Sequence, residues 1–216
     1  MTDIVKNTIE NLKRNNMEAY YCENTQQAKE KVALLLENCK TVSSGGSATL
    51  AQTGILDYIK SDRFEYLDRF KEGMTDRERR EVFAKIQLAD AYLMSSNAIT
   101  ENGELYNVDG NSNRVSALLY GPESVIIVAG VNKIVKNLDE AVMRVKKCAA
   151  PPNGKRLNTN TPCAMTGECI CLKKDAPLIT DGCRSKGRMC CNYVICAQQR
   201  HVNRIKVIIV NENLGY

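Results

Sequence analysis

The sequence predicts an α/β fold, with an open, mostly parallel sheet and helices on both of its faces. Three observations support this prediction. Short apolar runs alternate along the chain with amphipathic segments of helical period. Residues 124–129 are apolar on both faces, which is typical of a central parallel strand. Residues 43–50 form a small-residue turn between a strand and a helix, and ligands of parallel sheets bind beyond such strand ends.

Individual elements follow from the spacing of apolar residues. A hairpin over residues 97–106 is expected to turn at Asn102-Gly103, because this pair favours the left-handed backbone of tight turns. Pro151 and Pro152 are expected to end a helix and to mark a boundary. This boundary separates an α/β core, residues 1–150, from residues 151–216, which form a cysteine-rich segment and a final strand returning to the core. The expected helices cover residues 3–15, 26–37, 48–60, 82–88 and 138–148, and the expected strands cover 17–22, 40–42, 63–67, 89–96, 124–129 and 202–210.

Composition argues against several classes of partner. The net charge of +5 arises from 30 basic and 25 acidic residues spread along the chain, which is too mild and too even for a nucleic-acid-binding surface. There is no Trp and there are three Phe, so stacking platforms for single strands are scarce. The N-terminus has no signal-peptide pattern, and no apolar stretch reaches the length of a membrane span. We therefore expect a cytoplasmic protein that binds neither nucleic acid nor membranes.

The Gly-rich turn is the first candidate binding element. Glycine lets a backbone approach a ligand closely, and exposed N–H groups at a helix start attract anions. The turn matches neither the Walker nor the dinucleotide fingerprint, and an ordinary helix cap is the alternative. A second open question concerns residues 68–81, which form either a solvated or lid-like connection or a basic cluster that meets a charged substrate. The turn residues expected to bind are Ser44, Gly45, Gly46 and Ser47.

Two further polar loops are expected at the same edge of the sheet. Glu101 and Asp109 would supply two carboxylates for general acid–base chemistry, as an enediol mechanism requires. Arg114 could hold an anionic group bidentately. The alternative is an ordinary hairpin turn, an ordinary loop and a structural ion pair. The further ligand-binding candidates on these loops are Asn97, Gly110 and Asn113.

Three stretches resemble the LUD (lactate-utilisation) domain family, which includes lactate-utilisation protein C and stand-alone proteins of anaerobes. They are residues 95–103 (SSNAITENG), 107–115 (NVDGNSNRV) and 125–134 (VIIVAGVNKI). The resemblance extends over nearly the whole chain. It implies the α/β fold of ribose-5-phosphate isomerase, glucosamine-6-phosphate deaminase and the coenzyme A transferases. Residues 101–103 are also similar to the Glu-Asn-Gly motif of the transferases, in which the glutamate forms a thioester.

Cysteines form the second functional signal. Cytosolic thiols stay reduced, so a disulfide framework is not expected. Cys22, Cys39 and Cys148 stand among apolar residues and are expected to be buried. The other seven of the ten lie between residues 163 and 196, where four thiolates could hold zinc or an iron–sulfur cluster. Free or oxidised thiols and a redox-active pair are the alternatives. His201, the single histidine, is expected at the surface.

The family resemblance suggests which thiols would bind metal. In relatives, two cysteines bracket a Ser-Pro-x-Arg turn; here Lys186 replaces the proline, and residues 170–182 form an insertion. The insertion leaves the third ligand open between Cys171 and Cys183, and the fourth open between Cys190 and Cys191. The implied set of metal ligands is Cys163, Cys169, Cys183 and Cys190.

Two functions from different classes remain. The first is an enzyme or binder for a small anionic metabolite, such as a sugar phosphate, a 2-hydroxy acid or an acyl-coenzyme A, with a link to lactate utilisation implied by the family. The second is a non-catalytic, metal-binding subunit of a lactate-oxidising complex with iron–sulfur partner proteins. Relatives of the fold suggest a homodimer. Whether the protein is an enzyme stays open, because a fold alone does not specify a function.

Overall fold

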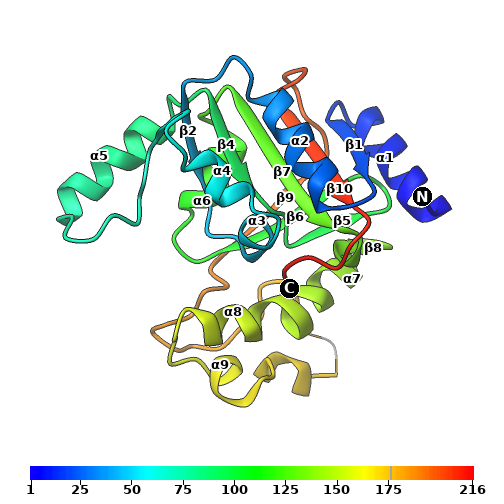
Figure 1. The fold of residues 1–216 in the computed structure, drawn as a ribbon. Coiled ribbons are helices and arrows are strands. Elements are labelled where there is room, and N and C mark those ends of the chain that lie inside the picture. The colour runs from blue at the N-terminus through cyan, green and yellow to red at the C-terminus, as the bar shows by residue number, and fades with distance from the viewer. Residues whose placement is uncertain (176) are drawn as a thin grey trace.

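A six-stranded, all-parallel sheet forms the centre of the computed structural model, which describes residues 1–175 and 177–216 (Figure 1). Its order, β1-β10-β7-β4-β2-β3, places the apolar strand β7 inside the sheet, as its two-sided apolar sequence predicts. The α/β fold class is therefore confirmed. The strands are β1 (Glu18–Cys22), β2 (Thr41–Ser44), β3 (Glu65–Tyr66), β4 (Ala91–Met94), β7 (Ser124–Gly130) and β10 (Ile205–Val210).

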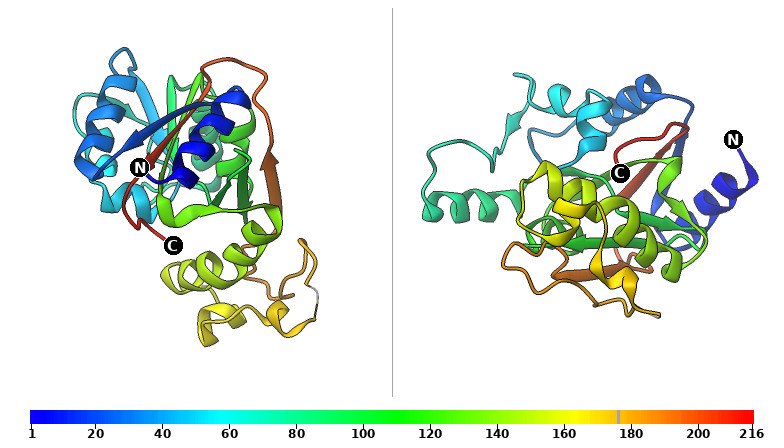
Figure 2. Two further views of the ribbon diagram at one scale, coloured as in Figure 1. Left: turned by 90° about the vertical axis from the view of Figure 1, so that its right-hand side faces the viewer. Right: turned by 90° about the horizontal axis from the view of Figure 1, so that it is seen from below.

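Helices cover both faces of this sheet (Figure 2). Alternate residues of each strand point to opposite faces, so Ile127 packs with one set of helices and Ile126 with the other. The first face carries α1 (Asp3–Arg14), α5 (Asp76–Ile86) and α6 (Asn113–Leu119). The second carries α2 (Thr25–Leu35), α3 (Ala48–Gln52) and α4 (Ile55–Ile59). No helix in the described part of the chain is long and apolar enough to cross a bilayer.

A second sheet of four strands and a helical extension complete the molecule. The sheet has the order β8-β5-β6-β9 and consists of β5 (Ala98–Thr100), β6 (Leu105–Asp109), β8 (Ile134–Val135) and β9 (Asn192–Cys196). A short 3-10 helix, η1 (Val131–Lys133), joins β7 to β8. The extension lies beyond the lower edge of the main sheet in Figure 1 and comprises α7 (Leu138–Arg144), α8 (Ala150–Arg156), α9 (Pro162–Thr166) and the 3-10 helix η3 (Ile170–Lys173).

Two predicted helix boundaries were wrong. The helix expected over residues 48–60 is two short helices, because Gly54 adopts the left-handed conformation (φ +66°) between them. The prolines at 151 and 152 do not end a helix. A π-helical segment, Val145–Ala149, connects α7 to α8, and the prolines occupy the first turn of α8, where a missing N–H costs little.

The predictions for the hairpin and for single cysteine and histidine residues were partly confirmed. The hairpin turn at Asn102-Gly103 is present, with Gly103 at φ +79°. Residues 107–109, expected in a loop, extend strand β6. Cys22 is buried and His201 is exposed, as predicted, whereas Cys148 is exposed because it lies on the outer side of the π-helical segment.

Candidate functional site

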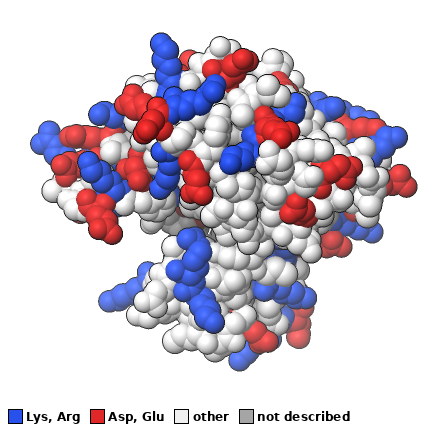
Figure 3. Space-filling view, in the orientation of Figure 1, with Lys and Arg blue, Asp and Glu red and all other residues white. Residues whose placement is uncertain are grey.

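A cavity of about 300 Å³ lies at the carboxyl edge of the six-stranded sheet. Segments that follow four of its strands line this cavity, together with the Asp109–Arg114 loop and helix α8. Figure 3 shows the surface hollowed between the sheet and the helical extension, with Lys and Arg side chains beside the hollow. The segments after the strands contribute Gly46 and Ser47 after β2, Ser95 to Asn97 after β4, Lys133 after β7, and Gly215 and Tyr216 after β10.

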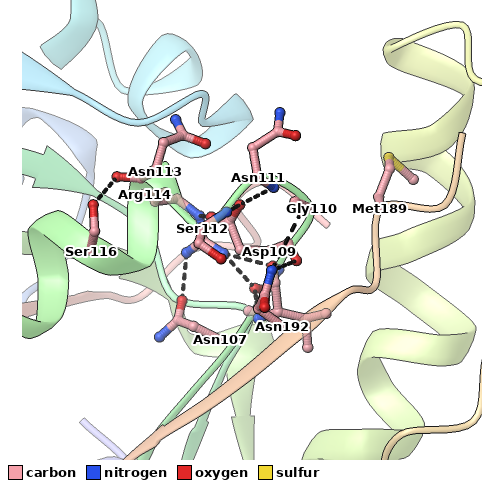
Figure 4. Close-up of polar contacts among 12 residues, drawn as sticks. Asn107, Asp109, Gly110, Asn111, Ser112, Asn113, Arg114, Ser116, Met189 and Asn192 are labelled. Atoms are coloured by element: carbon pink, nitrogen blue, oxygen red, sulfur yellow. Dashed lines mark hydrogen bonds and ion pairs between the residues drawn. The ribbon is translucent and has the colours of Figure 1, made fainter. Parts of the chain in front are cut away.

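Arg114 joins the Asp109–Arg114 loop to the strands beside it (Figure 4). Nη1 donates to Asn107 Oδ1 (2.6 Å) and to the carbonyl oxygen of Ser95 (3.4 Å). Nη2 donates to Asn97 Oδ1 (3.1 Å) and to the carbonyl oxygen of Val108 (2.8 Å). Nε lies 3.3 Å from Asp109 Oδ2. The N–H groups of Nη1 and Nη2 are therefore used within the protein and Nε faces the Asp109 carboxylate, so the bidentate grip on a ligand expected of Arg114 has no free pair of donors.

Asp109 is tied into the same network. Its Oδ1 accepts hydrogen bonds from the backbone N–H groups of Asn111 (3.1 Å) and Ser112 (3.0 Å), and its Oδ2 faces Arg114. These contacts fix the turn into α6 and neutralise the carboxylate. Asn111 and Asn113 differ, because their amide groups point away from this network in Figure 4 and both residues line the cavity.

The other predicted carboxylate lies elsewhere. Glu101 sits in the β5–β6 turn, where its N–H donates to the carbonyl oxygen of Val135 (2.8 Å) and its own carbonyl accepts from Asn11 of helix α1 (2.7 Å). It does not line the cavity. The structure therefore does not bring Glu101 and Asp109 together as an acid–base pair, because the hairpin turns back against α1 and away from the sheet edge.

The Gly-rich turn is only partly exposed to the cavity. Ser44 is buried and its Oγ bonds with Tyr66 Oη (2.8 Å). Gly45 is packed so closely that an added Cβ would lie 3.0 Å from Arg114 Cδ. Ser47 lines the cavity while its Oγ caps α3 by accepting from Leu50 N (3.2 Å). Of the four predicted turn residues, Gly46 and Ser47 reach the cavity and the other two support its lining.

Two arginines missed by the sequence analysis flank Gly46. A Cβ there would lie 3.6 Å from Arg69 Nη2 and 3.9 Å from Arg156 Nη2. Arg69 donates from Nε to the carbonyl oxygen of Ser44 (3.3 Å), and Arg156 donates from Nε to Tyr216 Oη (2.6 Å). Among the described residues, Nη1 and Nη2 of Arg69 and Nη1 of Arg156 have no hydrogen-bond partner. Both guanidiniums therefore keep N–H donors available to a ligand.

Lys133 is a third cation that the sequence analysis did not select. Its side chain is 4% exposed, and Nζ donates to Ser95 Oγ (2.9 Å) and Thr49 Oγ1 (3.0 Å). Burial, assisted by the guanidiniums of Arg144 and Arg114, lowers the pKa of Lys133 to about 7. In the described part of the chain, no carboxylate forms an ion pair with it.

The four cysteines of the predicted ligand set converge on a second, smaller pocket of about 30 Å³. Burial raises the pKa of the Cys190 thiol to about 11, and the nearby thiols of Cys163 and Cys169 act in the same direction. Cys171 and Cys191, the two alternative ligands, do not line this pocket. The four that do are Cys163, Cys169, Cys183 and Cys190.

Arg188 holds the loops that carry these cysteines. Its guanidinium donates to the carbonyl oxygens of Cys190 (2.7 Å), Thr180 (2.9 Å) and Cys183 (3.2 Å), and to Tyr193 Oη (3.0 Å). Gly182 permits this approach, because a Cβ there would lie 2.4 Å from the guanidinium carbon. Residues Met189 and Cys190 line both pockets, so the cysteine pocket adjoins the large cavity.

A weak signal for the missed cations was present in the sequence. Lys133 belongs to the stretch 125–134 and follows the carboxyl end of the central strand, which is where ligands of parallel sheets bind. Arg69 lies in the charged segment 68–81, for which contact with a charged substrate was one of two interpretations. No comparable signal marked Arg156, which follows the proline pair that was expected to end its helix.

Comparison with known proteins places the chain in a family. The LUD domain family model matches residues 5–210. No curated protein matches the sequence. Among solved structures, a DUF162 family protein from Deinococcus radiodurans is similar in fold, with a TM-score of 0.56 and 15% sequence identity over 96% of both chains. The match over nearly the whole length confirms the resemblance read from the motifs, and the chain belongs to the LUD domain family.

Proposed function

We propose that the protein binds a small anionic metabolite in the large cavity. The observation that carries this proposal is the charge balance of the lining. Arg69 and Arg156 are cations without a carboxylate partner among the described residues, whereas the carboxylate of Asp109 is neutralised by Arg114. Cations in a concave, partly desolvated site attract anions strongly.

The size of the cavity narrows the ligand class. About 300 Å³ is at the lower end of small-molecule sites. A sugar phosphate or a 2-hydroxy acid suits this volume, whereas an acyl-coenzyme A would place only its acyl end inside. A link to lactate utilisation is part of this proposal, and it rests on family membership rather than on any one side chain.

Calorimetric titration of the full chain with ribose 5-phosphate, L-lactate and inorganic phosphate tests the proposal. Arg69→Gln and Arg156→Gln should each weaken binding about tenfold or more, because each removes a charge-assisted hydrogen bond. Arg77→Gln is the matched control, since Arg77 is exposed, pairs with Glu81 and does not line the cavity. No binding of any of the three anions, or an equal loss in all three variants, would contradict the proposal.

A second candidate function is suggested by the cysteine pocket, namely a metal-binding subunit of a redox complex. Four thiols are the donor set of a closed zinc site or an iron–sulfur cluster, so the residues fit such a group in chemistry. As they stand, no three histidine, cysteine or carboxylate side chains among the described residues are arranged as metal ligands. Binding would therefore draw the thiols together and order the segment that carries them.

Elemental analysis and a visible absorption spectrum of protein purified without oxygen test this candidate. Cys163→Ser and Cys190→Ser should each lower the metal content and the thermal stability. Cys148→Ser is the control, because Cys148 is exposed and does not line the pocket. One zinc per chain without colour would support a structural site, iron with sulfide would support electron transfer, and metal-free protein would reject this function.

A further inference from the structure

We infer that Lys133 is a nucleophile that forms an imine with a small carbonyl-bearing anion, a 2-oxo acid, bound in the large cavity. This inference rests on the proposed function and deepens it by naming the substrate class. It assigns a covalent role to a residue that lies outside the predicted site. Three features of the structure support it: the hydrogen bonding of Nζ, its electrostatic surroundings and the cations that share the cavity.

Hydrogen bonding around Nζ matches a neutral amine. A neutral amine has two N–H groups and one lone pair, whereas an ammonium has three N–H groups. Nζ donates to two hydroxyl oxygens, those of Thr49 and Ser95. Each of these hydroxyls directs its own hydrogen to a backbone carbonyl, of Leu214 and Ser96 respectively, both at 3.4 Å. Both amine hydrogens are thereby used, and the lone pair remains for an electrophile.

The surroundings of Lys133 favour the neutral form. The charged groups that act on it are Arg144 from helix α7 and Arg114 from helix α6, and both are cations. A buried lysine beside cations and without a carboxylate releases its proton readily, which is how lysines become nucleophiles in Schiff-base chemistry. The pKa of about 7 agrees with this geometry.

The remaining cations indicate which carbonyl compound would bind. Arg69 and Arg156 line the same cavity with unused N–H donors, which suit a carboxylate. A 2-oxo acid carries a carboxylate directly beside an electrophilic carbonyl carbon, so one small molecule could satisfy both the arginines and the amine. Lys133, Arg69 and Arg156 all line this one cavity.

The imine step is balanced without a co-reactant. The Nζ lone pair attacks the carbonyl carbon, a C–N bond forms and the carbonyl oxygen becomes a hydroxyl. Loss of that hydroxyl as water gives the C=N bond. The two amine hydrogens leave in the water, and no electron is gained or lost. Ser95 and Thr49 are placed to pass protons between nitrogen and oxygen, because their hydroxyls already contact Nζ.

Reductive trapping tests this inference on the full chain. Protein is incubated with pyruvate and sodium borohydride, which adds hydride to an imine carbon and makes the adduct permanent. Intact mass and peptide mapping should find the reduced pyruvate adduct on Lys133, with a yield that rises with pH to a plateau above about 7. Lys133→Met and Lys133→Arg should lose the adduct, whereas Lys136→Met, which removes an exposed lysine nearby, should keep it.

Calorimetry with pyruvate on the same samples separates this inference from the proposed function. Binding of pyruvate without an adduct on Lys133, or adduct spread over surface lysines and unchanged in Lys133→Met, would overturn the inference and leave anion binding intact. If phosphate binds and pyruvate neither binds nor is trapped, the inference also falls while the proposed function stands. If no anion binds, both fall. Retention of folding in each variant is checked by circular dichroism.

Discussion

Arg114 and Lys133 are two basic side chains in the lining of one cavity, and their surroundings differ. The guanidinium of Arg114 donates four hydrogen bonds from Nη1 and Nη2, and its Nε pairs with the carboxylate of Asp109. Nζ of Lys133 has two neutral hydroxyls and no carboxylate among the described residues. A cation with complete pairing stabilises the structure around it. A lysine that is buried beside other cations and has no carboxylate partner has a pKa near neutral pH, and its amine is available to a ligand.

The largest effect on stability is expected from removing Arg114, the cation that is paired with Asp109. Arg114→Met leaves the carboxylate of Asp109 buried without its cation, and loss of one partner of a buried ion pair costs about 3–5 kcal/mol. Urea unfolding should show a loss in this range. The double variant Asp109→Asn/Arg114→Met should recover part of it, because no buried charge remains. A loss below about 1 kcal/mol would mean that the network does not stabilise the loop.

For Lys133 we expect the opposite effect, because this side chain destabilises the folded protein while it is protonated. Its pKa falls from 10.5 in the unfolded chain to about 7 in the folded one, so between these values the unfolded state binds the extra proton. The free energy of unfolding of the wild type should therefore rise with pH from about 7 upwards, relative to Lys133→Met, by as much as about 4 kcal/mol near pH 10.

Denaturant unfolding of both proteins over pH 6 to 10 measures this difference, and taking the difference removes the contribution of groups common to both. Lys136→Met serves as the control with an exposed lysine removed. Parallel pH profiles for the wild type and Lys133→Met would show that Lys133 keeps an ordinary pKa, and the contrast with Arg114 would then be lost.

A third cation extends the comparison to the cysteine pocket. Arg188→Met removes four hydrogen bonds that hold the loops carrying Cys183 and Cys190. We expect a loss of about 1–3 kcal/mol, and faster amide exchange and thiol alkylation in this segment than in the sheet. Arg184→Met is the matched control, because Arg184 is exposed. Equal exchange in both variants would show that Arg188 does not order these loops.

The smallest effects are expected from the two adjacent glycines. Gly45→Ala forces a Cβ to within 3.0 Å of the Arg114 stem and should cost about 1–2 kcal/mol. Gly46→Ala meets no atom closer than 3.6 Å, so it should leave stability within about 0.5 kcal/mol while it narrows the space between Arg69 and Arg156. Thermal unfolding and phosphate binding measured on both variants separate the two roles. A Gly46→Ala variant that is the less stable of the two would refute this assignment.

Prediction from sequence succeeded where local pattern and long-range structure agree. The strand at residues 124–129 lies inside the sheet because an apolar run on both faces has no other stable place. The hairpin at Asn102-Gly103 formed because that pair determines its own turn. Cys163 and Cys190 line one pocket. The family resemblance implies these two as metal ligands, and metal binding by them stays a prediction.

The sequence could not decide a side chain's role where that role depends on its partners. Asp109 and Arg114 form the structural ion pair that was one of two interpretations, and no spacing along the chain selects it. Glu101 was expected at the sheet edge because its loop follows the strand predicted over residues 89–96, whereas the hairpin turns towards α1. Lys133 looked ordinary in the sequence, since only burial among cations and hydroxyls gives it a low pKa.

The sequence by itself determined the class of fold, the order of its strands and helices along the chain, the family and the edge of the sheet at which polar loops collect. These properties depend on periodicity, turn residues and the rule that parallel strands share a carboxyl edge. Tertiary structure alone decided which charges are paired and which remain available. Pairing depends on distances between residues such as Thr49, Ser95 and Lys133, which are far apart in the chain and meet only when the sheet is assembled.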